Sequence, residues 1–145
     1  MTGLFETFSL PGNDTNAGAV LYIAGTVCMT AWMRRVEFRQ GGRAAGIAGL
    51  DLLSSISLAV PALAYWNVHL GARLGDGVLR LLFVLGLLGL FGFVAVDARA
   101  MLRHPRLNQH QRRRFAAIGA VAMLLPSSLE VWWAGSALMH VHAPA

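Results

Sequence analysis

Four apolar runs divide the sequence, and they constrain its fold more than any other feature. They cover residues 17–33, 44–66, 77–96 and 115–139 and are 17 to 25 residues long. Because an α-helix rises about 1.5 Å per residue, runs of this length can cross a bilayer core roughly 30 Å thick. Hydrophobic residues make up 56% of the chain and charged residues only 13%, which is unlike a soluble domain. The sequence therefore predicts an integral membrane protein.

Lipid also decides the secondary structure of these runs. Each backbone must satisfy its own hydrogen bonds in the membrane, so all four runs are predicted to be α-helices. The connections are short, and consecutive helices should therefore be antiparallel neighbours. We predict an all-α fold with a four-transmembrane-helix bundle over residues 17–139. Residues 1–16 are expected to form an outer interfacial leader, and residues 140–145 an outer tail.

Arginine indicates how the chain is threaded. The chain has no lysine, and ten of its 12 basic residues lie in the first and third connections: Arg34, Arg35, Arg39, Arg43, Arg99, Arg103, Arg106, Arg112, Arg113 and Arg114. Short basic connections remain cytoplasmic. We therefore expect a multi-pass protein of a bacterial inner membrane with both termini periplasmic. The expected partners are the lipid bilayer and other membrane subunits or copies of itself, with no nucleic acid.

Small residues indicate where the helices touch. Gly86, Gly89 and Gly92 recur at three-residue steps in the third run, and Ala45 and Gly49 are four residues apart in the second. Small side chains let two membrane helices approach closely. We expect these five residues to lie at helix contacts.

The second and fourth runs have similar sequences. Residues 43–69 aligned on residues 114–140 match at eight of 27 positions, including Arg43 with Arg114 and Ser57 with Ser128. Duplicated halves are common in membrane proteins. This similarity raises the hypothesis that the fold consists of two duplicated helical hairpins.

Two acidic residues lie inside the apolar runs, where a charge costs about 2.5–3.5 kcal/mol. Asp51 lies about 6 Å from mid-membrane towards the cytoplasm, and Glu130 about 5 Å towards the outside, at about 1.5 Å per residue. Arg80 is at an outer depth from which it could pair with Glu130. Asp51 has no evident charged partner. We expect either a neutral aspartic acid bonded to Ser54 or Ser55, or a proton-carrying site.

Histidines offer the other chemistry. His69, His140 and His142 are all predicted at the outer face, and neutral imidazoles bind copper, zinc or haem iron. They are either solvated surface residues or part of a haem or copper site. The single cysteine, Cys28, cannot form an intramolecular disulfide. No catalytic motif is present, so we expect no enzymatic activity of the chain's own, and the sequence requires no cofactor.

Three classes of function fit these features. Small size, minimal connections and glycine-rich faces favour an accessory or structural subunit of a larger inner-membrane complex, for example an energy-converting one. The alternative is a small homo-oligomeric transporter or pore, proton-coupled or holin-like, that uses Asp51 and Glu130. A third class is a metal- or haem-binding redox protein that uses the outer histidines.

Overall fold

The computed structural model describes residues 16–140, with the side chain of His140 excluded. Within this range the regular structure is entirely α-helical, which confirms the predicted all-α class. The elements are α2 (Ala17–Met33), α3 (Arg35–Gln40), α4 (Gly42–Trp66), α5 (Val68–Leu74), α6 (Asp76–Leu102) and α7 (Gln109–His140). Apart from Asn16 and the end of α7, the predicted leader and tail lie outside the described residues.

Helix length and composition make a membrane location plausible for part of the predicted bundle. Within the described range, three helices are long and apolar enough to cross a membrane: α4, α6 and α7. Helix α2 is also apolar but has only 17 residues, about 25 Å at 1.5 Å per residue against a core of about 30 Å. A fourth span, formed by α2, therefore stays a prediction.

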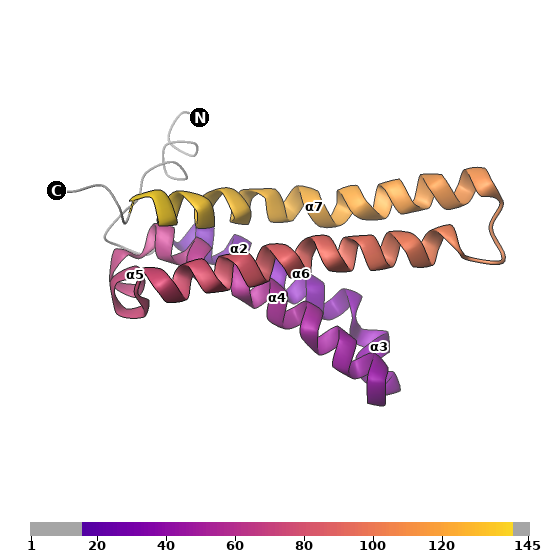
Figure 1. The fold of residues 1–145 in the computed structure, drawn as a ribbon, viewed down its shortest axis with the longest axis horizontal. Helices are drawn as coiled ribbons and strands as arrows, with labels where there is room; N and C mark the ends of the chain where they lie inside the picture. The colour runs from indigo at the N-terminus through magenta and orange to yellow at the C-terminus, as the bar shows by residue number, and fades with distance from the viewer. Residues whose placement is uncertain (1–15, 141–145) are drawn as a thin grey trace.

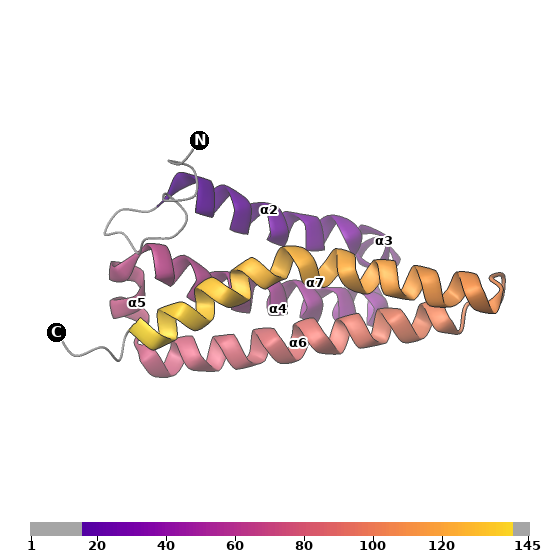
Figure 2. The ribbon, with the colours of Figure 1, turned by 90° about the horizontal axis from the view of Figure 1, so that it is seen from above.

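The long helices form two antiparallel hairpins (Figures 1 and 2). One consists of α2 and α4 with α3 at its turn, and the other of α6 and α7. The hairpins meet near α5 and the start of α2, which we name the terminal end, and they diverge towards α3 and the α6–α7 turn, which we name the arginine-rich end (Figure 1). Whether the two hairpins are duplicated copies stays a hypothesis.

Asparagine and glycine set the helix boundaries. The side chain of Asn67 accepts a hydrogen bond from the Leu70 amide at 3.1 Å and begins α5. Gly41 and Gly75 have φ angles of 70° and 77°, in the left-handed region that glycine adopts most easily, and they precede α4 and α6. Asn108 and Gln111 cap each other reciprocally before α7, at 2.8 and 3.2 Å, which satisfies amides that the first helical turn leaves unpaired.

Aromatic side chains build the core at the terminal end. The rings of Trp66 and Trp133 meet edge to face with centroids 5.5 Å apart, and Tyr22 meets Trp133 in the same way at 5.8 Å. Tyr65 packs beside Trp66 at 5.2 Å. Edge-to-face pairs stabilise by about 0.5–1.5 kcal/mol beyond their buried area. This aromatic core (Tyr22, Tyr65, Trp66 and Trp133) joins α2, α4 and α7 where the two hairpins meet.

Glycine permits close packing of α4 on α6. A Cβ added to Gly86 would come within 2.9 Å of the Leu58 backbone nitrogen, and one added to Gly89 would overlap the side chain of Ser54. Ser54 Oγ also donates to the Gly86 carbonyl at 3.2 Å. The helices therefore approach closely at two of the three glycines of the predicted stripe.

The other small residues named from sequence lie elsewhere. A Cβ added to Gly92 or Gly49 would meet nothing within 4 Å, so neither glycine is needed for packing within the described chain. Ala45, one turn before Gly49, is half-buried. Three-residue spacing drifts around a helix that has 3.6 residues per turn, which is why Gly92 leaves the contact that Gly86 makes.

Candidate functional site

A polar face runs along the apolar helix α2. Tyr22, Thr26 and Thr30 of α2 and Arg34, its C-cap, follow one another at four-residue steps, and residues four apart lie on the same side of a helix. Each side chain bonds to a different part of the bundle. We call these four residues the polar face of α2. It is directed inward, so the hydroxyl and guanidinium groups avoid lipid.

Arg34 ties three helices together at the end of α2. Its Nε donates to Asp51 Oδ2 of α4 at 2.6 Å. Its two terminal nitrogens donate to the carboxylate of Asp97 on α6, at 2.6 and 3.1 Å, in the bidentate geometry that guanidinium favours. Burial lowers the pKa of Arg34, but its bonds to Asp97 and Asp51 outweigh this effect and raise the pKa above its ordinary value.

The expectation that Asp51 lacks a charged partner is therefore wrong. Its side chain is 8% exposed and pairs with Arg34, which lies 17 residues earlier. The sequence places Arg34 in a connection outside the membrane. A long arginine side chain can nevertheless reach back along an apolar helix, and the antiparallel α2–α4 hairpin brings it beside Asp51 in the third turn of α4.

Glu130 lies deeper in the bundle and is almost fully buried, at 2% exposure. Its Oε1 is hydrogen-bonded to Thr26 Oγ1, and Thr26 Oγ1 also lies 2.8 Å from the Ile23 carbonyl. A threonine hydroxyl has one proton and can both donate and accept. It can therefore donate to a Glu130 carboxylate, or donate to Ile23 while accepting from a protonated Glu130. The contact suits both states of the acid.

The predicted pair of Arg80 with Glu130 is wrong. Arg80 Nε lies 2.9 Å from Asp76 Oδ2, one turn earlier on α6, and the Arg80 side chain is 53% exposed. Glu130 instead bonds to Thr26 of α2. The sequence predicts similar membrane depths for Arg80 and Glu130, but depth does not specify the side of the helix on which each side chain lies. Glu130 faces α2, while Arg80 pairs along its own helix.

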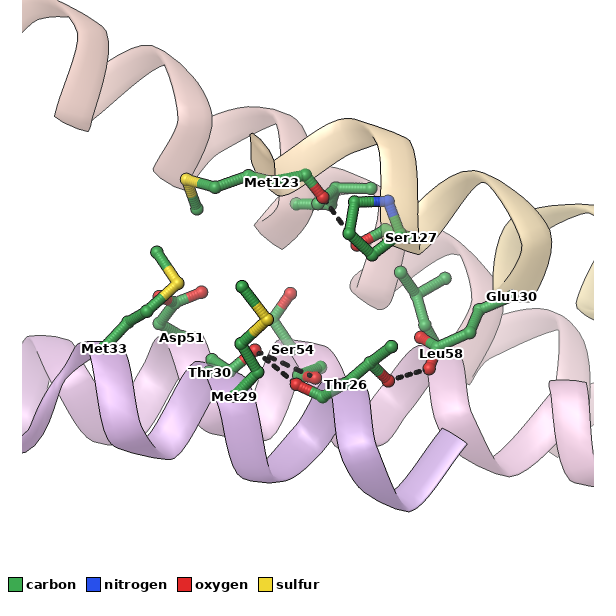
Figure 3. A pocket seen from close by; sticks show the side chains of 13 residues that line it. Thr26, Met29, Thr30, Met33, Asp51, Ser54, Leu58, Met123, Ser127 and Glu130 are labelled. Carbon is green, nitrogen blue, oxygen red and sulfur yellow. Dashed lines mark hydrogen bonds between the residues drawn. The ribbon is translucent and has the colours of Figure 1, made fainter. Parts of the chain in front are cut away.

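A cavity of about 50 Å³ separates the two buried acids. Thr26 and Thr30 line it from α2, Asp51 from α4, and Ser127 and Glu130 from α7. Figure 3 shows the threonines of α2 facing Ser127 and Glu130 across this space. A volume of this size, with several hydroxyl and carboxyl partners, is sufficient for a few water molecules.

Hydroxyl groups bridge much of the distance between the acids. Thr30 Oγ1 donates to the Thr26 carbonyl at 3.1 Å and lies 3.4 Å from Ser55 Oγ. Thr26 is the partner of Glu130, and Arg34 is the partner of Asp51. Thr26 and Arg34 are eight residues apart, or about 12 Å along a helix. We call the set from Asp97 through Arg34, Asp51 and the cavity to Glu130 the polar column.

The aromatic core closes the polar column towards the terminal end. Tyr22 donates its hydroxyl proton to the Pro126 carbonyl at 2.6 Å, and its ring packs against Trp133. At the opposite end, the Asp97 side chain is 36% exposed. The column therefore has a partly exposed acid at the arginine-rich end and packed aromatic rings at the terminal end.

Comparison with protein-family models, with curated proteins and with solved structures finds no match for this chain. The geometry of the polar column is thus the basis for assigning a function.

Histidines do not converge in the described part of the chain. His69 is exposed on α5, and His140 ends α7. His142 lies outside the described residues. Among the described side chains of residues 16–139, no three histidine, cysteine, aspartate or glutamate groups lie together so that they could hold a metal ion. A haem or copper site at the outer face stays a prediction.

Sequence reasoning found the two acids but missed the residues that connect them. Thr26, Thr30, Arg34 and Asp97 complete the polar column. A signal for three of them is present in the sequence, because polar residues recur at every fourth position from Tyr22 to Arg34 in an otherwise apolar run. Asp97 carries no such signal, since it lies at the expected end of a span.

Proposed function

We propose that this protein transfers protons through the interior of its helical bundle. The observation that carries this function is that Asp51 and Glu130 line one small cavity, with hydroxyl groups between them. Ionisable residues inside a membrane protein commonly mark proton or ion pathways. Here both acids face the bundle interior, and each has polar partners on α2.

The proposed cargo follows from the size of the cavity. A cavity of about 50 Å³ holds a few water molecules. It is small for a hydrated metal ion or an organic substrate in the described conformation. Protons need only a carboxyl group, a hydroxyl group or a water molecule at each step, and the polar column supplies these groups.

The proposed route begins at Asp97, which is accessible at the arginine-rich end. Arg34 lies between Asp97 and Asp51 and stays charged, so the proton passes from Asp97 to Asp51 by way of water beside the guanidinium. It then crosses the cavity to Glu130, whose contact with Thr26 accommodates both of its protonation states. Release at the terminal end requires that Tyr22 leaves the Pro126 carbonyl and that the aromatic core opens. The described conformation is the form closed at that end.

The proposed orientation of the bundle in the membrane follows from its arginines. Short basic connections resist translocation, so the arginine-rich end is placed in the cytoplasm of a bacterial cell and both termini in the periplasm. Protons then enter or leave the polar column from the cytoplasmic side. The membrane potential and the pH gradient set the direction of net transfer.

The test is proton flux into liposomes that contain the purified protein. A potassium gradient with valinomycin supplies the driving voltage, and a trapped pH-sensitive dye reports the internal pH. We expect flux above that of protein-free liposomes, and we expect Asp51→Asn and Glu130→Gln each to reduce it at least tenfold. Both substitutions keep hydrogen-bonding capacity but remove the exchangeable carboxyl proton.

Asp76→Asn is the matched control. Asp76 is an acid of α6 that pairs with Arg80 and does not line the cavity. Proton flux through the Asp76→Asn variant should therefore equal that of the unmodified protein. Size-exclusion profiles and helical circular dichroism should be unchanged in all three variants. Flux that survives both cavity substitutions, or no flux in the unmodified protein, would contradict proton transfer.

A second function is favoured by the outer faces of the bundle. Gly46 and Gly49 of α4 and Gly92 of α6 have no neighbours where a Cβ would lie, and small residues let a partner helix approach closely. These faces support a role as an accessory subunit of a larger membrane complex. Gly49→Leu should then release a partner that co-purifies under mild detergent, while Gly25→Leu, at another open position on α2, should not.

A further inference from the structure

The turn between α6 and α7 concentrates positive charge without compensation. From residue 98 to residue 114 the chain contains no acidic residue. Six arginines lie in this segment: Arg99, Arg103, Arg106, Arg112, Arg113 and Arg114. We call residues 99–114 the basic turn. Its charges repel one another, so a stable arrangement favours an anionic partner.

The other basic segment of the chain is different. Residues 34–43 contain four arginines and Glu37. Arg34 is neutralised by Asp51 and Asp97, and the guanidinium of Arg35 lies over the Trp32 ring, 4.1 Å from its centroid. Two of the four arginines in this segment therefore have a partner within the chain. Apart from Asp97, which precedes Arg99 by two residues and binds Arg34, the basic turn has no carboxylate nearby in sequence.

In a bilayer, the lengths of the helices would place the basic turn at the level of the lipid headgroups. Helix α7 has 32 residues and is about 48 Å long, which exceeds a bilayer core of about 30 Å by about 18 Å. The α6–α7 hairpin also extends beyond α3 at the arginine-rich end (Figures 1 and 2). Five of the six arginines are exposed. Arg112 instead donates to the Leu107 carbonyl at 2.7 Å and fixes the turn against α7.

We propose that the basic turn binds the phosphate groups of anionic lipids. Guanidinium groups bind phosphate oxygens through paired, charge-assisted hydrogen bonds. Four to eight basic residues next to a membrane helix are a typical site for anionic headgroups, each contributing about 1 kcal/mol. Lipid is favoured over a soluble phosphate because the arginines continue directly from two apolar helices, which place them in the headgroup layer. This site is independent of proton transfer.

The test compares two triple variants in detergent. Arg106→Gln/Arg113→Gln/Arg114→Gln removes exposed charges from the basic turn, and Arg35→Gln/Arg39→Gln/Arg43→Gln removes the same number from residues 34–43. Native mass spectrometry measures the binding of phosphatidylglycerol and of phosphatidylcholine. We expect the basic-turn variant to lose about a hundredfold in affinity for phosphatidylglycerol, at about 1 kcal/mol per arginine. The control should lose less than tenfold, and neither should change for phosphatidylcholine.

Two further measurements use the unmodified protein and do not depend on how the variants fold. Phosphatidylglycerol binding should weaken as salt is raised, because screening acts on exposed charges. Millimolar inorganic phosphate should not displace the lipid. Equal losses in the two variants, equal binding of the two lipids, or displacement by inorganic phosphate would each overturn an anionic-lipid site at the basic turn.

Discussion

Arg34 is the residue on which the arginine-rich end of the bundle depends. It is the only cation within 4.0 Å of either Asp51 or Asp97 among the described side chains. Arg34→Ala would leave Asp51 buried with its charge uncompensated, which typically costs about 3–5 kcal/mol. We expect a correspondingly large fall in the thermal stability of the detergent-solubilised protein, measured by circular dichroism.

Arg39→Ala is a suitable control, because Arg39 is exposed on α3 and should change stability by less than about 1 kcal/mol. Combining Arg34→Ala with Asp51→Ala should cost less than the sum of the single changes, since the second removes the stranded charge. Additive losses would show that the two side chains do not stabilise each other.

At the residue scale, the sequence predicted which acids are buried better than it predicted the residues that bond to them. Asp51 and Glu130 are recognisable because each is the sole acid in an apolar run. An ionisable residue in such a run is energetically costly and therefore usually has a structural or functional role. Which group shelters each acid depends on the rotation of its helix about its own axis. Depth alone suggested Arg80 for Glu130, whereas the rotation of α7 directs Glu130 to Thr26. A polar residue at every fourth position of α2 was the available clue.

At the scale of elements, the close contact of α4 with α6 depends on Gly86. Gly86→Ala would place a Cβ 2.5 Å from Leu58 Cγ and 2.9 Å from the Leu58 backbone nitrogen. The backbone atom cannot move without shifting α4, so we expect a loss of about 1–3 kcal/mol, as for other overpacked sites. Thermal unfolding in detergent measures this loss.

Gly92→Ala tests whether the effect comes from packing and not from glycine itself. The two glycines are on the same helix, but a Cβ at Gly92 meets nothing within 4 Å. Alanine is the better helix former, so Gly92→Ala should leave stability unchanged or raise it slightly. A destabilised Gly92→Ala variant, or a fully stable Gly86→Ala variant, would be inconsistent with the described α4–α6 contact.

Helix positions were predictable from hydropathy, and helix ends less so. The first run, 17–33, coincides with α2, but α7 begins at Gln109, six residues before its apolar run at 115. Asn108 and Gln111 cap α7 before the three consecutive arginines. Hydropathy detects where a helix enters the hydrocarbon, while capping decides where the helix begins, and the two boundaries differ when a helix continues into the headgroup layer.

At the scale of the whole molecule, packing and polarity are divided between the two ends. The two hairpins meet at the terminal end and diverge towards the arginine-rich end (Figure 1). Aromatic rings fill the core at the terminal end, and the polar column lies between that core and the arginine-rich end. The aromatic core therefore packs against the polar column at the terminal end, while Asp97 is partly exposed at the arginine-rich end. This arrangement makes the placement of α2 decisive, because α2 contributes the polar face.

The last prediction concerns α2, which has 17 residues and is short for a full crossing. Its polar face bonds to α4 and α7 along its length, and Ala19 and Ile23 are buried in the core, so we expect it to cross the membrane beside them. In a Cys28→Ser background, Gly18→Cys and Val68→Cys at the terminal end should react with an impermeant maleimide from one side. Gln40→Cys, at the arginine-rich end, should react only from the other. If Gly18→Cys and Gln40→Cys were labelled from the same side, α2 would lie along the surface, only α4, α6 and α7 would span the membrane, and the polar face would not line a transmembrane route.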